Sequence, residues 1–404
     1  MKKTHKNLIT NISLAYASLI FIVLPTFFPV FNNKIIYLNA ALLLLGVYMY
    51  TKTKNKVFLF LNMIVFVLNE ILYNMCVVDI YPPSEKTKMF YDITDIYHYS
   101  SGRGTGNYTE GYYPDEESKT ESQEANDIRK FNYWIDLMNI VPGETVLEAG
   151  CGSGEFLKYL KTQGVNVVGI TLSEETTVRL NKEGIQCYRH DYRLPNKQLD
   201  NRFDHIFFPG SLEHLTQEMI SCPNKLATAQ TKKIKELIDN IVLWFKPESS
   251  KNNLFIAHLH VKPKYNKSFP AYLLERSYGG SYFPDKEGIR IFDAIRKANS
   301  KFTTTFVEDR TFDYYYVSVS NPKHFGYPGG FNDAFTTISA LIAFLAAPFT
   351  YPFLWHMLLY DKLGIWMWQF DGEYHPLNCG INKCELTKER PVSLLYAISQ
   401  YKPT

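Results

Sequence analysis

Residues 145–154, Thr-Val-Leu-Glu-Ala-Gly-Cys-Gly-Ser-Gly, constrain the fold more than any other stretch of this chain. An apolar, β-prone run reaches Glu148, and glycine then occupies every second position, at Gly150, Gly152 and Gly154. A helix-like segment follows, so the order predicts a strand, a tight turn and the N-terminus of a helix. Glycines in such a turn permit positive φ angles and let a ligand approach the main-chain N–H groups closely. The stretch therefore predicts a ligand-binding turn.

Composition sets outer limits on what the chain can be. Its 404 residues suffice for one large domain, or for two smaller ones with attachments. The net charge of +3 is too small to indicate nucleic-acid binding, so we expect no nucleic-acid partner. Six cysteines without a pairing rhythm favour a reducing compartment. The 29 Tyr and 28 Phe fit an enzyme that handles apolar substrates at a membrane, and they fit a genome rich in A and T equally well.

Glu148 and the three glycines have the spacing E-x-G-x-G-x-G, which resembles motif I of class I S-adenosylmethionine (SAM) methyltransferases. The nucleotide-binding fingerprint of dehydrogenases has a different spacing, G-x-G-x-x-G. In the methyltransferases this loop holds the amino-acid end of SAM. The resemblance implies that SAM is the cofactor and that Glu148 and the glycines bind it. It also implies an α/β, Rossmann-like fold with a seven-stranded, mostly parallel sheet.

Residues 108–113, Tyr-Thr-Glu-Gly-Tyr-Tyr, resemble the Y-S-C-x-Y-F motif of the cyclopropane-fatty-acid-synthase family. That family includes the mycolic acid cyclopropane synthases and the fungal sphingolipid C9-methyltransferases. The match implies that Tyr108 and Thr109 help to hold SAM. It also places Glu110 where the family has its cysteine.

The string Gly-Ile-Thr-Leu-Ser, at the end of a predicted strand over 165–170, closely matches the family's G-x-T-L-S signature. The match places Thr171 and Leu172 beside SAM, where many SAM enzymes have an acidic residue for the ribose hydroxyls. Glu175 replaces a frequent glutamine, so it can accept hydrogen bonds but not donate them. Asp191, after the predicted third strand, is the candidate contact of the adenine amino group, and a helix cap is the alternative.

The remaining matches identify candidate catalytic residues. Glu213, in Gly-Ser-Leu-Glu-His after the predicted fourth strand, resembles the family's G-x-F-E-H, and the alternative is a carboxylate that favours a helix start. His258, in the predicted fifth strand, matches the active-site histidine of the family's L-L-H-T-I, and His260 replaces its isoleucine. Tyr315 matches the family's active-site tyrosine. We expect the sixth and seventh strands in the region around this tyrosine.

The family is understood to use a bound bicarbonate as the base, held by the cysteine, the glutamate, the histidine and the tyrosine. Glu110 replaces the cysteine, so its carboxylate either occupies the place of bicarbonate as a built-in base or repels the anion together with Glu213. Two carboxylates in one apolar pocket raise the pKa of one of them. In either case we predict that activity does not require added bicarbonate.

The first 81 residues have the pattern of a membrane anchor. Residues 8–31 contain no charge and are long enough to span a bilayer, and residues 35–50 are again apolar. Flanking lysines predict a helical hairpin with both basic ends in the cytoplasm, and a buried helical bundle is the alternative. A third apolar run, 57–81, carries Glu70, which is costly at mid-span, so we expect an interfacial helix. The catalytic domain would then lie on the cytoplasmic face, at the endoplasmic reticulum or another endomembrane in a eukaryotic cell.

The rest of the chain divides into three parts. Residues 82–125 are polar and rich in Gly and Tyr, which predicts a loop that acts as an active-site lid. Residues 126–330 form the predicted methyltransferase domain. Residues 331–404 begin strongly apolar, which predicts a helical extension that dips into the membrane or covers an acyl channel, or else a buried core helix. Cys379 and Cys384 are a lone pair, so no metal site is expected.

Three functions follow from these features. The first is a membrane-embedded methyltransferase that acts on a carbon of an unsaturated lipid chain in the bilayer, either a fatty acyl chain or a sphingoid base. The second is an N- or O-methyltransferase of a lipid headgroup, for which a general base beside a polar headgroup is expected. The third is a membrane scaffold that keeps the fold without turnover. SAM binding distinguishes the third from the other two.

Overall fold

The computed structural model describes four continuous segments and a few single residues between Tyr48 and Lys88. The segments are residues 109–215, 226–261, 291–317 and 391–403. The chain divides into two compact units, and in the first, residues 1–81 with 339–358, only single residues are described. Within the described parts, no helix is long and apolar enough to cross a membrane. The predicted hairpin, interfacial helix and apolar run after residue 331 lie outside the described residues.

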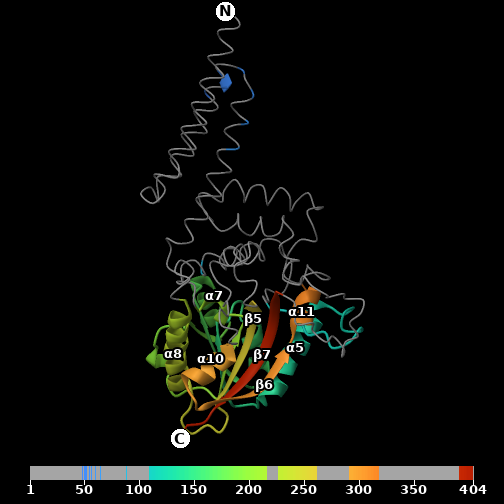
Figure 1. Cartoon of the computed structure of the whole chain (residues 1–404). Helices are drawn as coiled ribbons and strands as arrows, with labels where there is room; N and C mark the ends of the chain where they lie inside the picture. Colours follow the sequence, from blue (N-terminus) through green and yellow to red (C-terminus); the bar gives the residue numbers. More distant parts are fainter. Residues whose placement is uncertain are drawn as a thin grey trace, which may run out of the picture. The chain divides into compact units, whose positions relative to one another are not determined.

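The second unit is built on a seven-stranded sheet with the order β3-β2-β1-β4-β5-β7-β6 (Figure 1). Neighbouring strands from β3 to β5 are parallel, and β7 runs antiparallel between β5 and β6. The bounds are Thr145–Ala149 (β1), Asn166–Thr171 (β2), Gln186–Arg189 (β3), His205–Pro209 (β4), Asn253–Val261 (β5), Phe302–Asp309 (β6) and Val392–Tyr401 (β7). The predicted mostly parallel, seven-stranded α/β sheet is confirmed.

The last strand of the sheet corrects the sequence analysis. β7 comes from Val392–Tyr401, within the stretch that was predicted to be a helical extension. The sixth strand lies in the expected region, at Phe302–Asp309, but the seventh does not, because the residues around Tyr315 form the short helix α11, Thr311–Tyr315. β7 forms backbone hydrogen bonds with two strands, and seven of its ten residues are buried, on both faces of the sheet, so it belongs to the core of the domain. Local sequence pattern could not assign it, because its partners lie far away in the chain.

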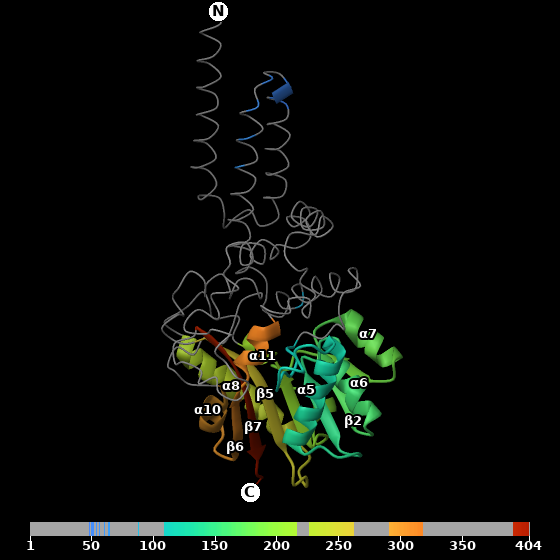
Figure 2. The ribbon, with the colours of Figure 1, turned by 90° about the vertical axis from the view of Figure 1, so that its right-hand side faces the viewer.

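Helices cover both faces of the sheet (Figures 1 and 2). Residues of α8 and α10 pack on one face around Trp244, and residues of α5 and α6 pack on the other around Trp134. The α5 helix begins after Ser122, whose hydroxyl caps the main-chain N–H of Ala125. The helix bounds are Gln123–Met138 (α5), Glu155–Thr162 (α6), Glu174–Lys182 (α7), Leu226–Trp244 (α8) and Ile291–Ala298 (α10).

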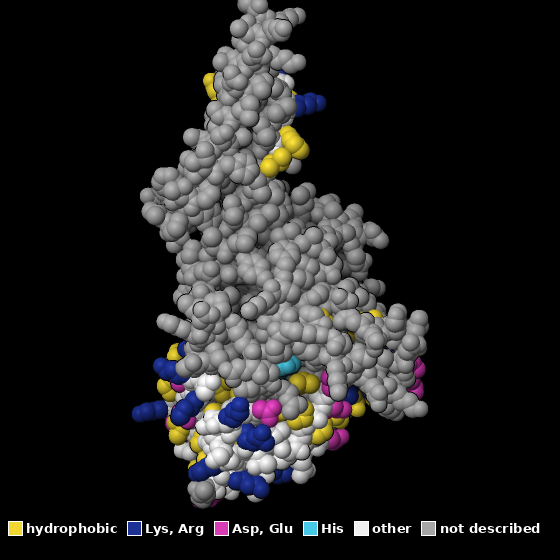
Figure 3. All heavy atoms as spheres, viewed as in Figure 1, with side chains coloured by type: hydrophobic (Ala, Val, Ile, Leu, Met, Phe, Trp, Pro, Cys, Tyr) yellow, Lys and Arg dark blue, Asp and Glu magenta, His cyan; other side chains and the backbone are white. Residues whose placement is uncertain are grey.

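The described surface carries charges of both signs. On the face in Figure 3, Lys and Arg side chains are spread between acidic, apolar and other side chains. The ion pairs of α8, between Lys235 and Asp239 and between Lys232 and Glu236, are exposed and four residues apart. Such pairs contribute little to stability.

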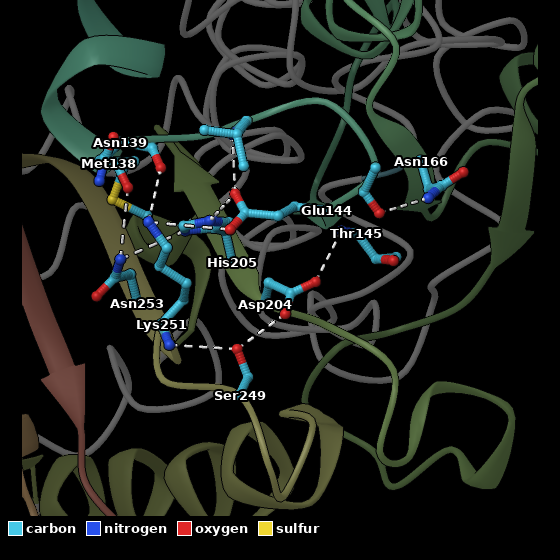
Figure 4. Close-up of polar contacts among 12 residues, drawn as sticks. Met138, Asn139, Glu144, Thr145, Asn166, Asp204, His205, Ser249, Lys251 and Asn253 are labelled. Atoms are coloured by element: carbon cyan, nitrogen blue, oxygen red, sulfur yellow. Dashed lines mark hydrogen bonds and ion pairs between the residues drawn. The ribbon is translucent and has the colours of Figure 1, made fainter.

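A polar cluster joins the amino ends of β1, β4 and β5 (Figure 4). The carboxylate of Asp204 accepts hydrogen bonds from the main-chain N–H of Thr145 at 2.9 Å and from the Ser249 hydroxyl at 2.8 Å. It also forms an ion pair with Lys246. This cluster lies at the edge of the sheet opposite to the carboxyl ends of the parallel strands, so it acts on stability rather than on chemistry.

Replacing Asp204 with alanine is expected to destabilise the domain by about 3 kcal/mol, because it leaves a buried N–H and a cation without their partner. Chemical denaturation monitored by tryptophan fluorescence measures the change. Asp239→Ala is the matched control, since its pair with Lys235 is exposed on α8 and the expected change is within about 0.5 kcal/mol. Equal losses in the two variants would contradict the role assigned to Asp204.

Candidate active site

The glycine turn lies at the carboxyl end of β1. Gly150, Gly152 and Gly154 have φ angles of 79°, 48° and 77°, a conformation that residues with a Cβ rarely adopt. A Cβ atom at Gly150 would lie 2.6 Å from the Cβ of Ser211. Ser211 in turn donates a hydrogen bond of 2.8 Å to the carbonyl of Ala149. The predicted strand, tight turn and helix start are confirmed, and the turn is held against the segment that follows β4.

Glu148 is buried beneath this turn, and Oε2 of its carboxylate has no hydrogen-bond partner among the described residues. Burial raises its pKa well above the ordinary value, and the charge of Lys130 opposes that rise. A buried acceptor without a donor is costly unless a ligand supplies one. The ammonium of the amino-acid end of SAM is such a donor. The residues present therefore fit SAM, and the binding roles predicted for Glu148 and the glycine turn stay predictions.

Thr171 and Leu172 lie at the carboxyl end of β2, beside the glycine turn of the adjacent parallel strand. The hydroxyl of Thr171 accepts a hydrogen bond of 3.2 Å from the main-chain N–H of Ser173, and Ser173 caps α7. Both Thr171 and Leu172 are half-buried, whereas Glu175 is exposed in the first turn of α7. The SAM contacts predicted for these three residues stay predictions.

Asp191, which follows β3, is held by its neighbour Arg193. The Arg193 side chain donates to the two carboxylate oxygens at 2.9 and 2.6 Å. Burial raises the pKa of Asp191, but the hydrogen bonds and charge of Arg193 outweigh this and hold the pKa below its ordinary value. The next helical turn of this described segment begins only at Lys197, so the interpretation of Asp191 as a helix cap is wrong. The adenine contact stays a prediction.

Glu213 lies in a short 3₁₀ turn directly after β4 and is 5% exposed. One of its carboxylate oxygens accepts a hydrogen bond of 2.7 Å from the main-chain N–H of Leu259 on β5. Burial raises the pKa of Glu213 to about 7; main-chain hydrogen bonds lower it, and the charge of Glu110 raises it. The site therefore holds a fixed carboxyl group that changes its charge near neutral pH.

His258 and His260 lie on β5 and are both buried. Side chains alternate between the two faces of a strand, and Ala257 packs in the same cluster as Tyr396 and Tyr315. His258 therefore projects from the opposite face of the sheet to Tyr396. Burial, together with the charge of His260, lowers the pKa of His258 to about 3, so this imidazole is neutral at physiological pH.

Lys130 of α5 is fully buried. It contacts residues 109–122, which are the described part of the predicted lid before α5 and are called the lid segment below. Its ammonium donates to the hydroxyl of Thr109 at 2.5 Å and to the carbonyl of Glu110 at 2.6 Å. Burial lowers the pKa of Lys130, and the negative charges of Asp127, Glu110 and Glu148 oppose this. One buried cation thus joins the lid segment to the neighbourhood of the motif I acid.

The lid segment is also tied to α11. Asp313 accepts a hydrogen bond of 3.1 Å from the main-chain N–H of Tyr113 and forms an ion pair with Arg310. Burial raises the pKa of Asp313 to about 7, although the charge of Arg310 lowers it. Tyr315, at the end of α11, is 5% exposed, and burial raises its pKa as well.

Comparison with known proteins finds similarity to cyclopropane synthases and related methyltransferases. A family model described as mycolic acid cyclopropane synthetase matches residues 80–232. The S-adenosylmethionine-dependent methyltransferase UmaA of Mycobacterium tuberculosis is 36% identical over 93 residues, which are 23% of this chain and 32% of that protein. Two curated mycobacterial relatives match over 26% and 32% of their own length, so this chain spans only a minor part of each.

Solved cyclopropane synthases share the fold. MmaA2 of Mycobacterium tuberculosis has a TM-score of 0.53 at 14% identity, with 80% of this chain and 99% of that chain covered. CmaA1, solved with SAH and CTAB, has a TM-score of 0.50 at 15% identity, with 79% and 98% covered. In sequence and fold, this chain resembles the cyclopropane synthases. The predicted resemblance, the class I SAM methyltransferase fold and the SAM cofactor are confirmed by these matches.

In this cyclopropane-synthase-like chain, the structure brings Glu110 and Glu213 near enough for the charge of one to raise the pKa of the other. It places His258 on the other face of the sheet. Tyr108 lies outside the described residues, so its predicted SAM contact is untested.

Sequence analysis gave no role to three residues that the structure places at the lid: Lys130, Asp313 and Tyr396. For Lys130 and Asp313 the sequence did contain a signal, because each is a charged residue within a mostly apolar helical pattern. Tyr396 carried none, since its strand was assigned to the C-terminal extension.

Proposed function

We propose that this chain is a SAM-dependent methyltransferase that adds a methyl group to a carbon of an unsaturated lipid chain. The single observation that carries this is the match of the mycolic acid cyclopropane synthetase model to residues 80–232, which contain the glycine turn, the lid segment and Glu213. The character of the site supports it. Three buried carboxyl groups, those of Glu110, Glu213 and Asp313, lie at the site, and negative charge favours a reaction in which the lipid carbon becomes positive.

In such a reaction, some residues of the chain bind SAM and another stabilises the charge that develops on the lipid. SAM supplies a methyl group made electrophilic by its positive sulfonium. The glycine turn and Glu148 hold its amino-acid end, and Lys130 keeps the lid segment closed over that end. Glu213, whose carboxylate is fixed by the N–H of Leu259, stabilises the positive charge that develops on the lipid. The buried aromatic and apolar surroundings exclude water, which would otherwise consume a carbocation.

We propose further that residues 1–81 anchor this domain to the cytoplasmic face of a membrane, so that its substrate is a lipid of that bilayer. The support lies in the sequence, in the uncharged runs 8–31 and 35–50 with their flanking lysines. An anchored enzyme meets a lipid substrate without extracting it into water, which would expose a large apolar area.

The test uses full-length protein expressed in membranes and SAM that carries a fully deuterated methyl group. Lipids are extracted, and mass spectrometry locates the label. Label on an acyl or sphingoid carbon supports the proposal, and the number of deuterons retained separates the products. A methyl branch beside a retained C=C bond keeps all three, whereas a methylene or cyclopropane product has lost one to the base.

Label on a headgroup nitrogen or oxygen would replace the proposal with headgroup methylation. SAM binding measured by calorimetry without any labelled lipid, in membranes from several sources, would favour the non-catalytic scaffold. A truncated protein that begins at residue 82 tests the anchor, because it is expected to leave the membrane fraction. Retention of that protein in the membrane would contradict an anchor confined to residues 1–81.

A further inference from the structure

Tyr396 and Glu110 form a buried pair that joins the two ends of the catalytic domain. The phenol of Tyr396 donates a hydrogen bond to one carboxylate oxygen of Glu110, across 286 positions of sequence. Glu110 is 5% exposed and Tyr396 is 1% exposed. The Tyr396 ring is itself fixed, because it packs edge-on against Phe255 and Trp134 with centroids 5.3 and 6.1 Å away. The donor therefore has a defined position.

The main chain at Glu110 is fixed as well. Its carbonyl accepts a hydrogen bond of 2.6 Å from the fully buried ammonium of Lys130. Glu110 is thus held at its backbone by α5 and at its side chain by β7. Its second carboxylate oxygen accepts no hydrogen bond from the described residues. A rigidly held carboxylate with one oxygen left over is suited to accept a proton from a substrate.

Glu110 lies near two other buried carboxyl groups. Its charge raises the pKa values of both Glu213 and Asp313, and Glu213 lies in the turn after β4, at the carboxyl end of the parallel strands. Of the three, Glu213 is engaged by the N–H of Leu259 and Asp313 by the N–H of Tyr113 and by Arg310. Glu110 is the one whose side-chain hydrogen bond comes from a phenol, which orients the carboxyl group.

We propose that Glu110 is the proton acceptor of the reaction and that Tyr396 is its positioning residue, an inference that rests on the proposed function. Once a methyl group has been added to a carbon–carbon double bond, the lipid carries a carbocation. A C–H bond on the carbon next to the cationic centre then breaks to give a C=C bond, or a C–H bond of the added methyl group breaks to close a cyclopropane ring; in either case its electron pair fills the empty orbital. The proton passes to the free oxygen of Glu110, which becomes a neutral carboxylic acid and later releases the proton to water.

The first test is chemical rescue of Glu110→Ala. This variant is expected to form product about 100-fold more slowly, with SAM affinity within about threefold of wild type. Sodium formate, a small carboxylate that fits the vacated space, is expected to raise the rate about tenfold. The control is Glu308→Ala, because Glu308 also accepts a tyrosine hydrogen bond, from Tyr133 at 2.6 Å. That variant is expected to keep its rate and to show no response to formate.

The second test is Tyr396→Phe, which keeps the ring packing and removes only the donor. We expect product to form about tenfold more slowly, together with a larger isotope effect when the departing hydrogen is deuterium. Tyr133→Phe, which breaks the matched pair with Glu308, is expected to change neither quantity. In the Glu110→Ala background, Tyr396→Phe is expected to cause no further loss, because the group that it positions is absent.

Wild-type protein is expected to work at full rate in bicarbonate-depleted buffer. The inference is overturned if folded Glu110→Ala keeps the wild-type rate, if formate fails to restore it, or if wild type needs added bicarbonate. Failure of the proposed function looks different, since wild-type protein itself would then methylate no lipid carbon. Melting curves with and without SAM establish folding before any rate is compared.

Discussion

Replacing Glu213 with glutamine is expected to slow methyl transfer by about 1,000-fold and, at the same time, to stabilise the protein above neutral pH. The loss of rate follows because the fixed negative charge beside the reaction centre disappears, while the amide keeps nearly the same shape. SAM affinity is expected to stay within about threefold of wild type, since Glu148 and the glycine turn are the proposed binding groups of the cofactor.

The gain in stability has a defined sign and pH window. Burial raises the pKa of Glu213 from 4.5 to about 7, so the folded state retains a proton that the unfolded chain releases between these values. The contribution of protonated Glu213 to the free energy of unfolding is therefore fully present below pH 4.5 and is lost as pH rises through about 7. The penalty at pH 8 is about 3 kcal/mol, and Glu213→Gln is free of it at every pH.

Urea denaturation of both proteins at pH 5 and pH 8 measures this effect. The stability advantage of Glu213→Gln is expected to increase by about 2 kcal/mol between the two values. Glu236→Gln is the control, since Glu236 is exposed on α8 and is expected to show no pH-dependent difference. A Glu213→Gln protein with near wild-type rate, or with an advantage that shrinks as pH rises, would contradict the role of this residue.

Replacing Gly150 with alanine is expected to weaken SAM binding by about 100-fold and to lower the free energy of unfolding by about 3 kcal/mol. The residue has a φ angle of 79°, and the added Cβ would lie 2.6 Å from the Cβ of Ser211. Ser211 cannot rotate its Cβ away, so the glycine turn must shift from the position in which it is proposed to bind the cofactor.

Two matched variants separate the backbone strain of a positive φ angle from the steric clash with Ser211. Gly143→Ala introduces a Cβ at a φ angle of 90° with no atom within 4 Å, so it is expected to cost stability without affecting SAM affinity. The double variant Gly150→Ala/Ser211→Gly removes the colliding Cβ and is expected to recover at least part of the affinity. Calorimetric titration with SAM measures all of these proteins. Unchanged affinity in Gly150→Ala would show that the turn does not hold the cofactor.

The sequence by itself determined the parts of this protein whose physics is local. Alternating glycines after an apolar run specify a strand that ends in a turn with positive φ, and the turn was found where the spacing placed it. The parallel half of the sheet was similarly readable, because most of its strands are short buried runs followed by a motif. Thr171 and Glu213 could be placed at strand ends on the same grounds.

Tertiary structure alone decided the features that depend on distant partners. β7 has no local signature, since a strand buried on both faces has an apolar pattern that a helix can share. The pairing of Tyr396 with Glu110, the closure of Lys130 on the lid segment and the separation of His258 from Tyr396 all depend on the register between strands. That register is set by packing of the whole core, so the placement of the candidate base could emerge only once the chain had folded.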